Sequence, residues 1–143
     1  MEADRRGWVG WLLGGGIAAS LASFVYPVLR FVNPPEVSEA PVNEVTAGKI
    51  AELTVNSAKM VRFGSRPVLL IRTSDTEWRA FDGTCTHLNC TVQYQREGGQ
   101  IWCACHNGFY DLNGKVVSGP PPRALVQYEV NVRGDDVVIT KQS

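Results

Sequence analysis

Two short stretches decide the fold of this chain: CTHLNC at residues 85–90, the first box, and CACHNG at residues 103–108, the second box. All four cysteines and both histidines of the 143-residue chain lie in these boxes. The first box contains a Cys-x-His pair and the second a Cys-x-x-His pair, and each carries one further cysteine. Thiolates and imidazoles bind iron and zinc in proteins. The spacing therefore predicts a metal centre shared by two loops.

Two simpler interpretations of these residues remain open at this point. A structural zinc site can use two Cys and two His, but zinc modules usually space each Cys pair by two to four residues and each His pair by three to five. Here each half holds a mixed Cys/His pair, and two cysteines are left over. A chain with no metal often has isolated core cysteines and surface histidines. Such a chain rarely gathers all of them in one short stretch, as residues 85–106 do here.

The two boxes resemble the signature of the Rieske iron–sulfur proteins. In that family a [2Fe–2S] cluster has two Cys ligands on one iron and two His ligands on the other, which raises its reduction potential above that of all-Cys ferredoxins. The resemblance implies four ligands in this chain: Cys85 and Cys103 on one iron, and His87 and His106 on the other. Electron transfer is the function that this ligand set implies.

The resemblance extends to the residues around the ligands. The two remaining cysteines, Cys90 and Cys105, correspond to the family's disulfide, which ties the two boxes together and requires an oxidising compartment. The family's third loop, the proline loop that covers the cluster, corresponds to Gly119, Pro120, Pro121 and Pro122. A run of prolines fixes the backbone φ and stiffens such a loop.

Three positions bear on the reduction potential or the backbone of the boxes. Asn89 stands where the family usually has Gly, and a left-handed backbone would explain both residues. Gly108 stands where high-potential relatives have a serine that donates to a bridging sulfide, so a lower potential than theirs is expected. Tyr110 matches a family tyrosine whose hydroxyl bonds a ligand sulfur, here Cys85. A lowered potential would suit low-potential quinols such as menaquinol.

The N-terminal part of the chain predicts a membrane anchor. Residues 7–29 carry no charge, and about 20 apolar residues are enough to cross a bilayer as a helix. A cleaved signal peptide is the alternative, but its apolar region is shorter, roughly 7–15 residues. We therefore predict a retained tail and transmembrane helix over residues 1–32. Gly10 and Gly14 would allow close approach of a neighbouring helix in the membrane.

Charges and prolines around this segment predict its orientation. Arg5-Arg6 resembles a twin-arginine export signal, and positive charge favours the cytoplasmic side. We therefore expect a single-pass protein of a bacterial cytoplasmic or thylakoid-type membrane, with the remainder on the extracytoplasmic side. Residues 33–43 contain three prolines and two glutamates and are predicted to form a Pro-rich, flexible tether.

Residues 44–143 are predicted to form an all-β head domain. Short apolar runs, many of them alternating, are separated by Gly-containing turns. The expected strands lie at residues 59–63, 67–72, 78–81, 100–102, 114–117, 126–132 and 136–140. The Rieske resemblance implies stacked antiparallel sheets, with a cluster-binding subdomain at about residues 82–122. The net charge of zero indicates no nucleic-acid partner.

An anchored Rieske head resembles the iron–sulfur subunit of cytochrome bc or b6f complexes, which are quinol:cytochrome c or plastocyanin oxidoreductases. The resemblance implies a cytochrome b subunit, a c-type cytochrome and quinol as partners. His87 and His106 would contact the quinol and take part in proton-coupled electron transfer. One alternative is the Rieske subunit of a periplasmic molybdenum oxidase such as arsenite oxidase. A soluble Rieske ferredoxin is less consistent, because such ferredoxins typically lack the second Cys pair and the anchor.

Overall fold

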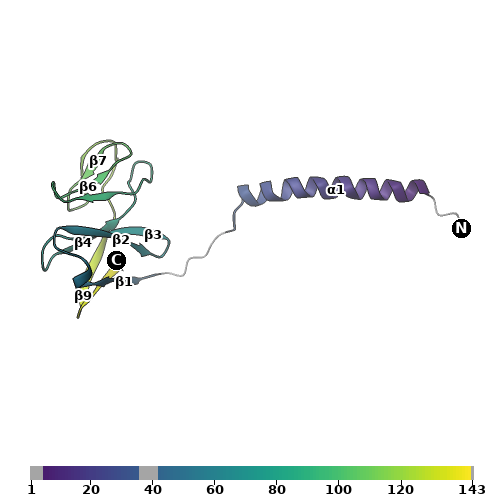
Figure 1. Cartoon of the computed structure of the whole chain (residues 1–143). Helices are drawn as coiled ribbons and strands as arrows, with labels where there is room; N and C mark the ends of the chain where they lie inside the picture. The colour runs from purple at the N-terminus through teal and green to yellow at the C-terminus, as the bar shows by residue number, and fades with distance from the viewer. Residues whose placement is uncertain (1–4, 36–41, 143) are drawn as a thin grey trace. The chain divides into compact units, whose positions relative to one another are not determined.

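The computed structural model describes residues 5–35 and 42–142, which form two compact units (Figure 1). One unit is built on a single helix and the other on β-strands. Most of the predicted tether, residues 36–41, lies outside the described residues.

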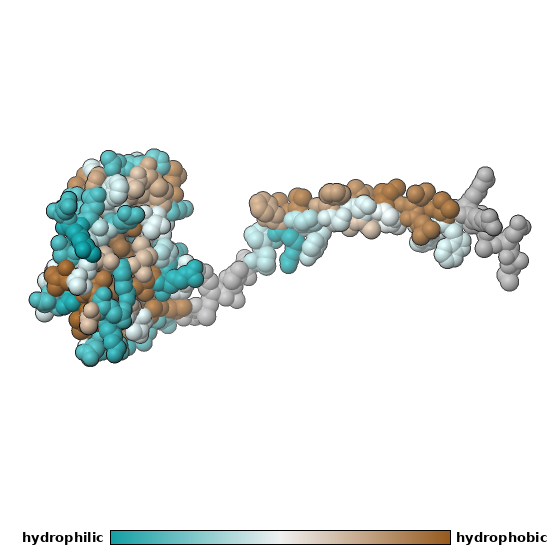
Figure 2. Space-filling view, in the orientation of Figure 1, coloured by the Kyte–Doolittle hydropathy of each residue, from teal (hydrophilic) through white to brown (hydrophobic). Residues whose placement is uncertain are grey.

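The helical unit contains α1, Arg5–Val32. Its segment from Gly7 to Val32 has 26 residues and a mean hydropathy of 1.7. At 1.5 Å per residue this segment is about 39 Å long, which exceeds the roughly 30 Å hydrocarbon core of a bilayer. The described large apolar side chains of the helix are exposed, and Figure 2 shows them as a brown surface along α1. The structure therefore has the predicted apolar helix, long enough to cross a membrane.

The regular elements of the other unit are antiparallel strands, as predicted, apart from one short 3₁₀ turn. Its strands are β1 (Glu44–Lys49), β2 (Ser57–Phe63), β3 (Arg66–Arg72), β4 (Trp78–Asp82), β5 (Gln93–Gln95), β6 (Gln100–Cys103), β7 (Gly108–Tyr110), β8 (Val116–Ser118), β9 (Gln127–Arg133) and β10 (Asp136–Lys141). One sheet has the order β1-β10-β9-β4-β3-β2 and the other β5-β6-β7-β8. A 3₁₀ turn, Ile50–Glu52, follows β1.

Each of the seven predicted strand segments overlaps a strand, although β8 begins two residues after the predicted start at 114 and β9 one residue after the predicted start at 126. Strands β1, β5 and β7 were not predicted. Strand β1 has an irregular register between Thr46 and Gly48, where the backbone of Gly48 has a φ of 127°, so its pattern does not alternate. Strands β5 and β7 have only three residues each, which is too short for a period of two to be recognised.

Strand β3 of the six-stranded sheet is buried on both faces, because its residues 68–71 are apolar without interruption. Successive side chains of a strand point to opposite faces. Val68 and Leu70 therefore join a core with strands β9 and β10, whereas Leu69 and Ile71 join a second core. This second core also holds Phe81 of β4. Its remaining members come from the four-stranded sheet and the loops around it: Cys85, Val92, Ile101, Cys103, Tyr110 and Leu125. The second core therefore fixes the smaller sheet to the larger one.

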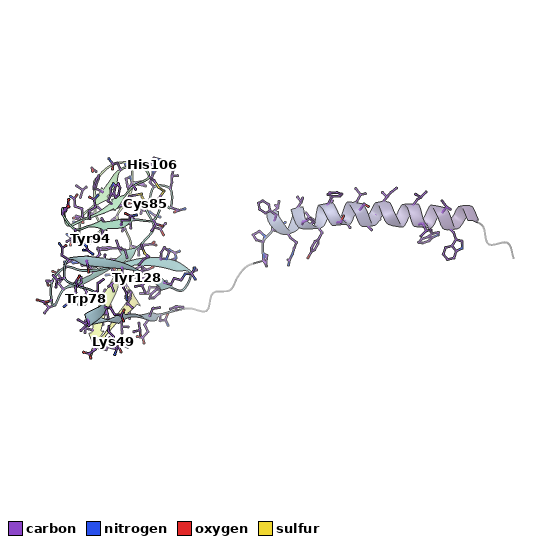
Figure 3. All side chains as sticks on the ribbon, in the orientation of Figure 1. Lys49, Trp78, Cys85, Tyr94, His106 and Tyr128 are labelled. Carbon is purple, nitrogen blue, oxygen red and sulfur yellow. A yellow bond between two sulfur atoms is a disulfide. The ribbon has the colours of Figure 1, made fainter. Side chains whose placement is uncertain are left out.

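The smaller sheet is inserted between two neighbouring strands of the larger one. The chain leaves the large sheet at the end of β4 and returns to it in β9, and Ala80 of β4 pairs with Tyr128 of β9. The first and last residues of the insertion therefore lie next to each other, at the end of β4 and the start of β9. Figure 3 shows Cys85 and His106 at the inserted end of this unit and Lys49 at the opposite end.

Candidate metal centre

The first box forms a closed loop directly after β4. The Asp82 carboxylate accepts a hydrogen bond from the Thr84 amide at 2.9 Å, and the Cys85 amide donates to the Cys90 carbonyl at 2.7 Å. Asn89 has a φ of 57°, which confirms the left-handed backbone predicted for this position. Asn tolerates this region better than most residues. The loop thereby reverses direction within six residues and places His87 near its turn.

The second box is the connection of the β6–β7 hairpin. Cys103 ends β6 and pairs with Gly108 at the start of β7. Asn107 has a φ of 57°, and its side-chain oxygen accepts a hydrogen bond from the Trp102 indole at 2.9 Å. No role was predicted for Asn107 from the sequence, although an Asn-Gly dipeptide is a turn signal. This turn presents His106 at the exposed end of the hairpin.

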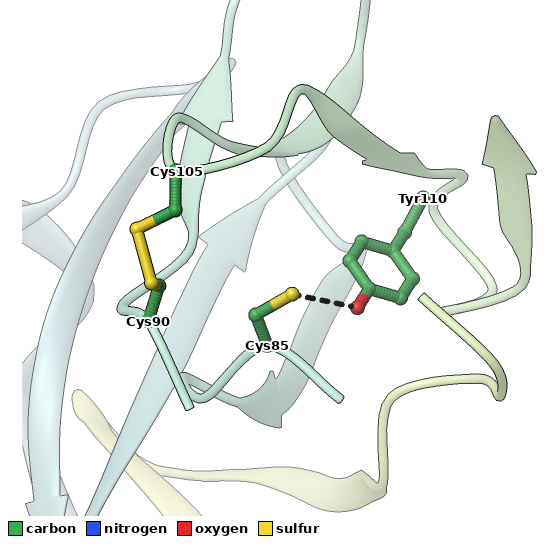
Figure 4. Close-up of a disulfide and its surroundings, with 4 residues drawn as sticks. All are labelled: Cys85, Cys90, Cys105 and Tyr110. Carbon is green, nitrogen blue, oxygen red and sulfur yellow. Dashed lines mark hydrogen bonds between the residues drawn. A yellow bond between two sulfur atoms is a disulfide. The ribbon is translucent and has the colours of Figure 1, made fainter. Parts of the chain in front are cut away.

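Cys90 and Cys105 form a disulfide between the two boxes, as predicted (Figure 4). Their Cα atoms lie 6.6 Å apart. Since one cysteine comes from each loop, the bond prevents the loops from separating. The Cys103 Sγ lies within 4.8 Å of both disulfide sulfurs. Sulfurs in a disulfide are not thiolates, so this group of three is not itself a metal site.

Cys85 and Cys103 are free thiols, and both are buried at 2 % exposure in the second core. Burial acts to raise the pKa of both thiols. The pKa of Cys103 is raised above its ordinary value as a result. For Cys85, several hydrogen bonds, led by those from the Tyr110 hydroxyl and the His87 amide, together outweigh burial and lower its pKa. Figure 4 shows the Cys85 sulfur directed at the Tyr110 hydroxyl, 3.3 Å away. The predicted tyrosine–cysteine contact is therefore present.

His87 and His106 approach each other from the two boxes. Their ring centroids are 4.7 Å apart and the rings are nearly perpendicular, at 83°. His87 is partly buried, whereas His106 is exposed. The Nδ1 atom of His87 is buried and has no hydrogen-bond partner among the described residues. A buried polar atom without a partner costs free energy, which metal coordination would recover.

The donor set fits an iron–sulfur cluster of mixed ligation. Two buried thiols supply soft sulfur ligands, and two imidazoles lie together on the exposed side of the same pair of loops. One imidazole nitrogen is buried without a hydrogen-bond partner in the described part of the chain, as expected of an atom that binds a metal. The residues present therefore suit a group that needs two Cys and two His.

The proline loop, residues 119–122, packs on the second box through glycine backbone. Gly119 has a φ of 94°, and a Cβ there would lie 2.7 Å from the Cα of Gly108. A Cβ on Gly108 would in turn lie 2.7 Å from the Cγ of Pro121, which is buried. Only glycine at both positions allows this approach without a shift, and the sequence analysis did not anticipate it.

Thr86 is a second residue that the sequence analysis passed over. Its hydroxyl donates a hydrogen bond to the Arg123 carbonyl at 2.8 Å and lies 3.1 Å from the Tyr110 hydroxyl. Thr86 therefore connects the first box to the residue that follows the proline loop. Its place between the Cys and His of the first box is the one signal in the sequence that could have drawn attention to it.

Comparison with known proteins agrees with this donor set. The family model for the Rieske [2Fe-2S] domain matches residues 43–129. The cytochrome b6-f complex iron-sulfur subunit of Chlorobaculum thiosulfatiphilum is 33% identical over 141 residues, which cover 99% of this chain and 77% of that protein.

Two solved structures have the same fold. The plasma membrane Rieske protein PetC3 from the cyanobacterium Synechocystis PCC 6803 is 28% identical, with a TM-score of 0.62 over 67% of this chain and 98% of that chain. A chain of a hyperthermophilic respiratory Complex III has a TM-score of 0.54 over 90% of this chain and 98% of that chain. At 21% identity, the second likeness concerns the fold alone.

Replacing Cys90 or Cys105 by Ser should lower the free energy of unfolding of the β unit. The bond closes a separation of 15 residues, for which the chain-entropy model gives about 3 kcal/mol. Denaturant unfolding, with and without reductant, measures this loss. Reductant should destabilise the unsubstituted protein to the level of the variants and leave the variants unchanged. Free, alkylatable thiols at both positions in the native protein would contradict the disulfide.

Proposed function

The chain belongs to the Rieske [2Fe–2S] family, and on that premise we propose that Cys85, His87, Cys103 and His106 are the four ligands of its single cluster. Support comes from the two buried thiols in one core and from the two imidazoles 4.7 Å apart. The unpartnered Nδ1 of His87 supports its assignment as a ligand atom. Cys90 and Cys105 hold the loops, and residues 119–122 cover the site.

We propose further that the chain is the electron-transfer subunit of a quinol:cytochrome c or plastocyanin oxidoreductase of the cytochrome bc/b6f kind. The observation that carries this proposal is the likeness to b6-f iron-sulfur subunits over 99% of the chain, α1 included. The subunit would be part of an oxidoreductase and not a complete enzyme by itself. The molybdenum-oxidase alternative is less well supported, since such a subunit needs no retained apolar helix.

When bound, the cluster accepts one electron and later passes it on. The chain's own contribution is to present the two imidazoles at the end of the β unit. An imidazole whose outer nitrogen faces solvent can accept a hydrogen bond from a quinol hydroxyl and hold its proton. His106 is exposed and satisfies this condition directly. Either His87 or His106 would thus accept the quinol proton at its outer nitrogen, next to the group that supplies the one-electron chemistry.

The remaining parts of the chain suggest how the site reaches its partners. We propose that residues 1–32 are a tail and anchor, that residues 33–43 are a tether, and that residues 44–143 are the head. The head would lie on the extracytoplasmic side of a bacterial cytoplasmic or thylakoid-type membrane. A flexible tether would let it move between a cytochrome b subunit, where quinol binds, and a c-type cytochrome.

Purification of the native protein in mild detergent tests the proposed assembly. Haem b should co-elute with the chain, because a cytochrome b subunit carries it and the anchor would remain in the complex. A variant lacking residues 1–32 should lose the haem and is the matched control. Co-elution with a molybdenum cofactor in place of haem b would favour the alternative oxidase.

Changing His87 or His106 to Ala should abolish the reduced-state EPR signal of a Rieske cluster. Each imidazole would supply one of the two protein bonds to the same iron, so one bond would remain. Circular dichroism should show that both variants keep the β fold. A normal EPR signal in either variant would contradict the ligand assignment, and a bound zinc ion without any EPR signal in the unsubstituted protein would contradict the cluster.

Changing Gly108 to Ser should raise the midpoint potential relative to Gly108→Ala, because only Ser adds a hydroxyl donor. Both variants add the Cβ that meets Pro121, so the Ala variant accounts for displacement of the proline loop. A hydrogen bond to a charged group contributes about 1.5–3 kcal/mol, and part of it differs between redox states. With 59 mV per tenfold change, a difference of several tens up to about 100 mV is expected. Redox titration measures the two midpoint potentials. Equal potentials for Gly108→Ser and Gly108→Ala would contradict the expectation that a hydroxyl at position 108 donates to the cluster.

A further inference from the structure

The Tyr110 hydroxyl lies at the meeting point of three groups. Tyr110 is fully buried, and its oxygen is 3.3 Å from the Cys85 sulfur. The same oxygen is 3.2 Å from the Thr86 amide nitrogen and 3.1 Å from the Thr86 hydroxyl. A phenol has one proton to donate, so these contacts cannot all be satisfied by Tyr110 as a donor.

The fourth contact in this group determines how the protons are arranged. The Thr86 hydroxyl is 2.8 Å from the Arg123 carbonyl, and a carbonyl can only accept. The single proton of Thr86 is therefore engaged with Arg123, and its hydroxyl can only accept from Tyr110. The Thr86 amide is a donor to the Tyr110 oxygen. The one proton of Tyr110 is left facing two acceptors, the Cys85 sulfur and the Thr86 hydroxyl.

Shared donation makes each of the two hydrogen bonds weaker than a bond to a single acceptor. A donor to a ligand sulfur stabilises the reduced, more negative state of an iron–sulfur site. An acceptor that competes for the same donor must act in the opposite direction. Both acceptors lie within hydrogen-bond distance of the Tyr110 oxygen, at 3.1 Å for the Thr86 oxygen and 3.3 Å for the larger sulfur atom.

We infer that Thr86 is a positioning residue that draws the Tyr110 proton away from Cys85 and so lowers the reduction potential of the site. The inference rests on the proposed role of Cys85 as a ligand. The Arg123 carbonyl keeps the Thr86 hydroxyl in its accepting orientation, and Arg123 directly follows the proline loop. The position of that loop therefore sets how much of the Tyr110 hydrogen bond reaches the sulfur.

Thr86→Val tests this inference, because valine has nearly the same shape and no hydroxyl. An EPR-monitored redox titration of the purified full-length protein should give a higher potential than that of the unsubstituted protein. We expect a threefold to tenfold change in the equilibrium constant for reduction, with tenfold corresponding to about 59 mV. Thr86→Ser, which keeps both hydroxyl contacts, should retain the original potential. Thr86→Ala gives the same test if the valine variant fails to assemble.

The Tyr110→Phe background separates this effect from loosening of the loops. Without the phenol there is no proton to redirect, so Thr86→Val should leave the potential of Tyr110→Phe unchanged. A shift of the same size in both backgrounds would overturn the inference and indicate a general effect of Thr86 on the loops. An unchanged or lower potential in Thr86→Val alone would also overturn it. Absence of a Rieske EPR signal from the unsubstituted protein would instead refute the proposed function.

Discussion

The apolar core between the two sheets is the constraint on which the site depends. Cys85 and Cys103 are members of this core, together with residues of β3, β4 and β6. The two thiols are therefore placed by packing of the whole β unit and not by the flexible loops alone. Protein interiors are close-packed, so a shift of either cysteine would disturb its neighbours in both sheets. His87 and His106 belong to the same two loops, so the packing of this core also fixes where the two imidazoles lie.

Three loops meet over this core, and each is held by a different kind of interaction. The first and second boxes are joined covalently through Cys90 and Cys105. The second box and the proline loop are joined by direct backbone approach at Gly108 and Gly119. The first box reaches the end of the proline loop through the hydroxyl of Thr86. Every pair of these three loops is thus connected. The loops are therefore held in place, which suits a site that transfers an electron without rearranging.

The chain combines a rigid head with an apolar helix in two separate compact units. The sheet core gives the metal-binding loops a fixed scaffold, whereas the helix has the length and composition to stay in a membrane. This division agrees with the proposed role, in which the head carries an electron between partners while the helix remains anchored.

The sequence by itself determined the family, the cysteine and histidine set, the disulfide and seven of the strands. These features depend on residue types at short spacings, such as the pairs within each box and the alternation along β9 or β10. The contact of Tyr110 with Cys85 was also expected, from the family resemblance. Only the tertiary structure decided the contacts of Thr86, which meets Tyr110 from 24 positions away and Arg123 from 37 positions away. The fit of Gly108 against Gly119 and Pro121 likewise arises only when β7 and the proline loop pack together. Local patterns carry no information about such contacts, because packing of the complete fold creates them.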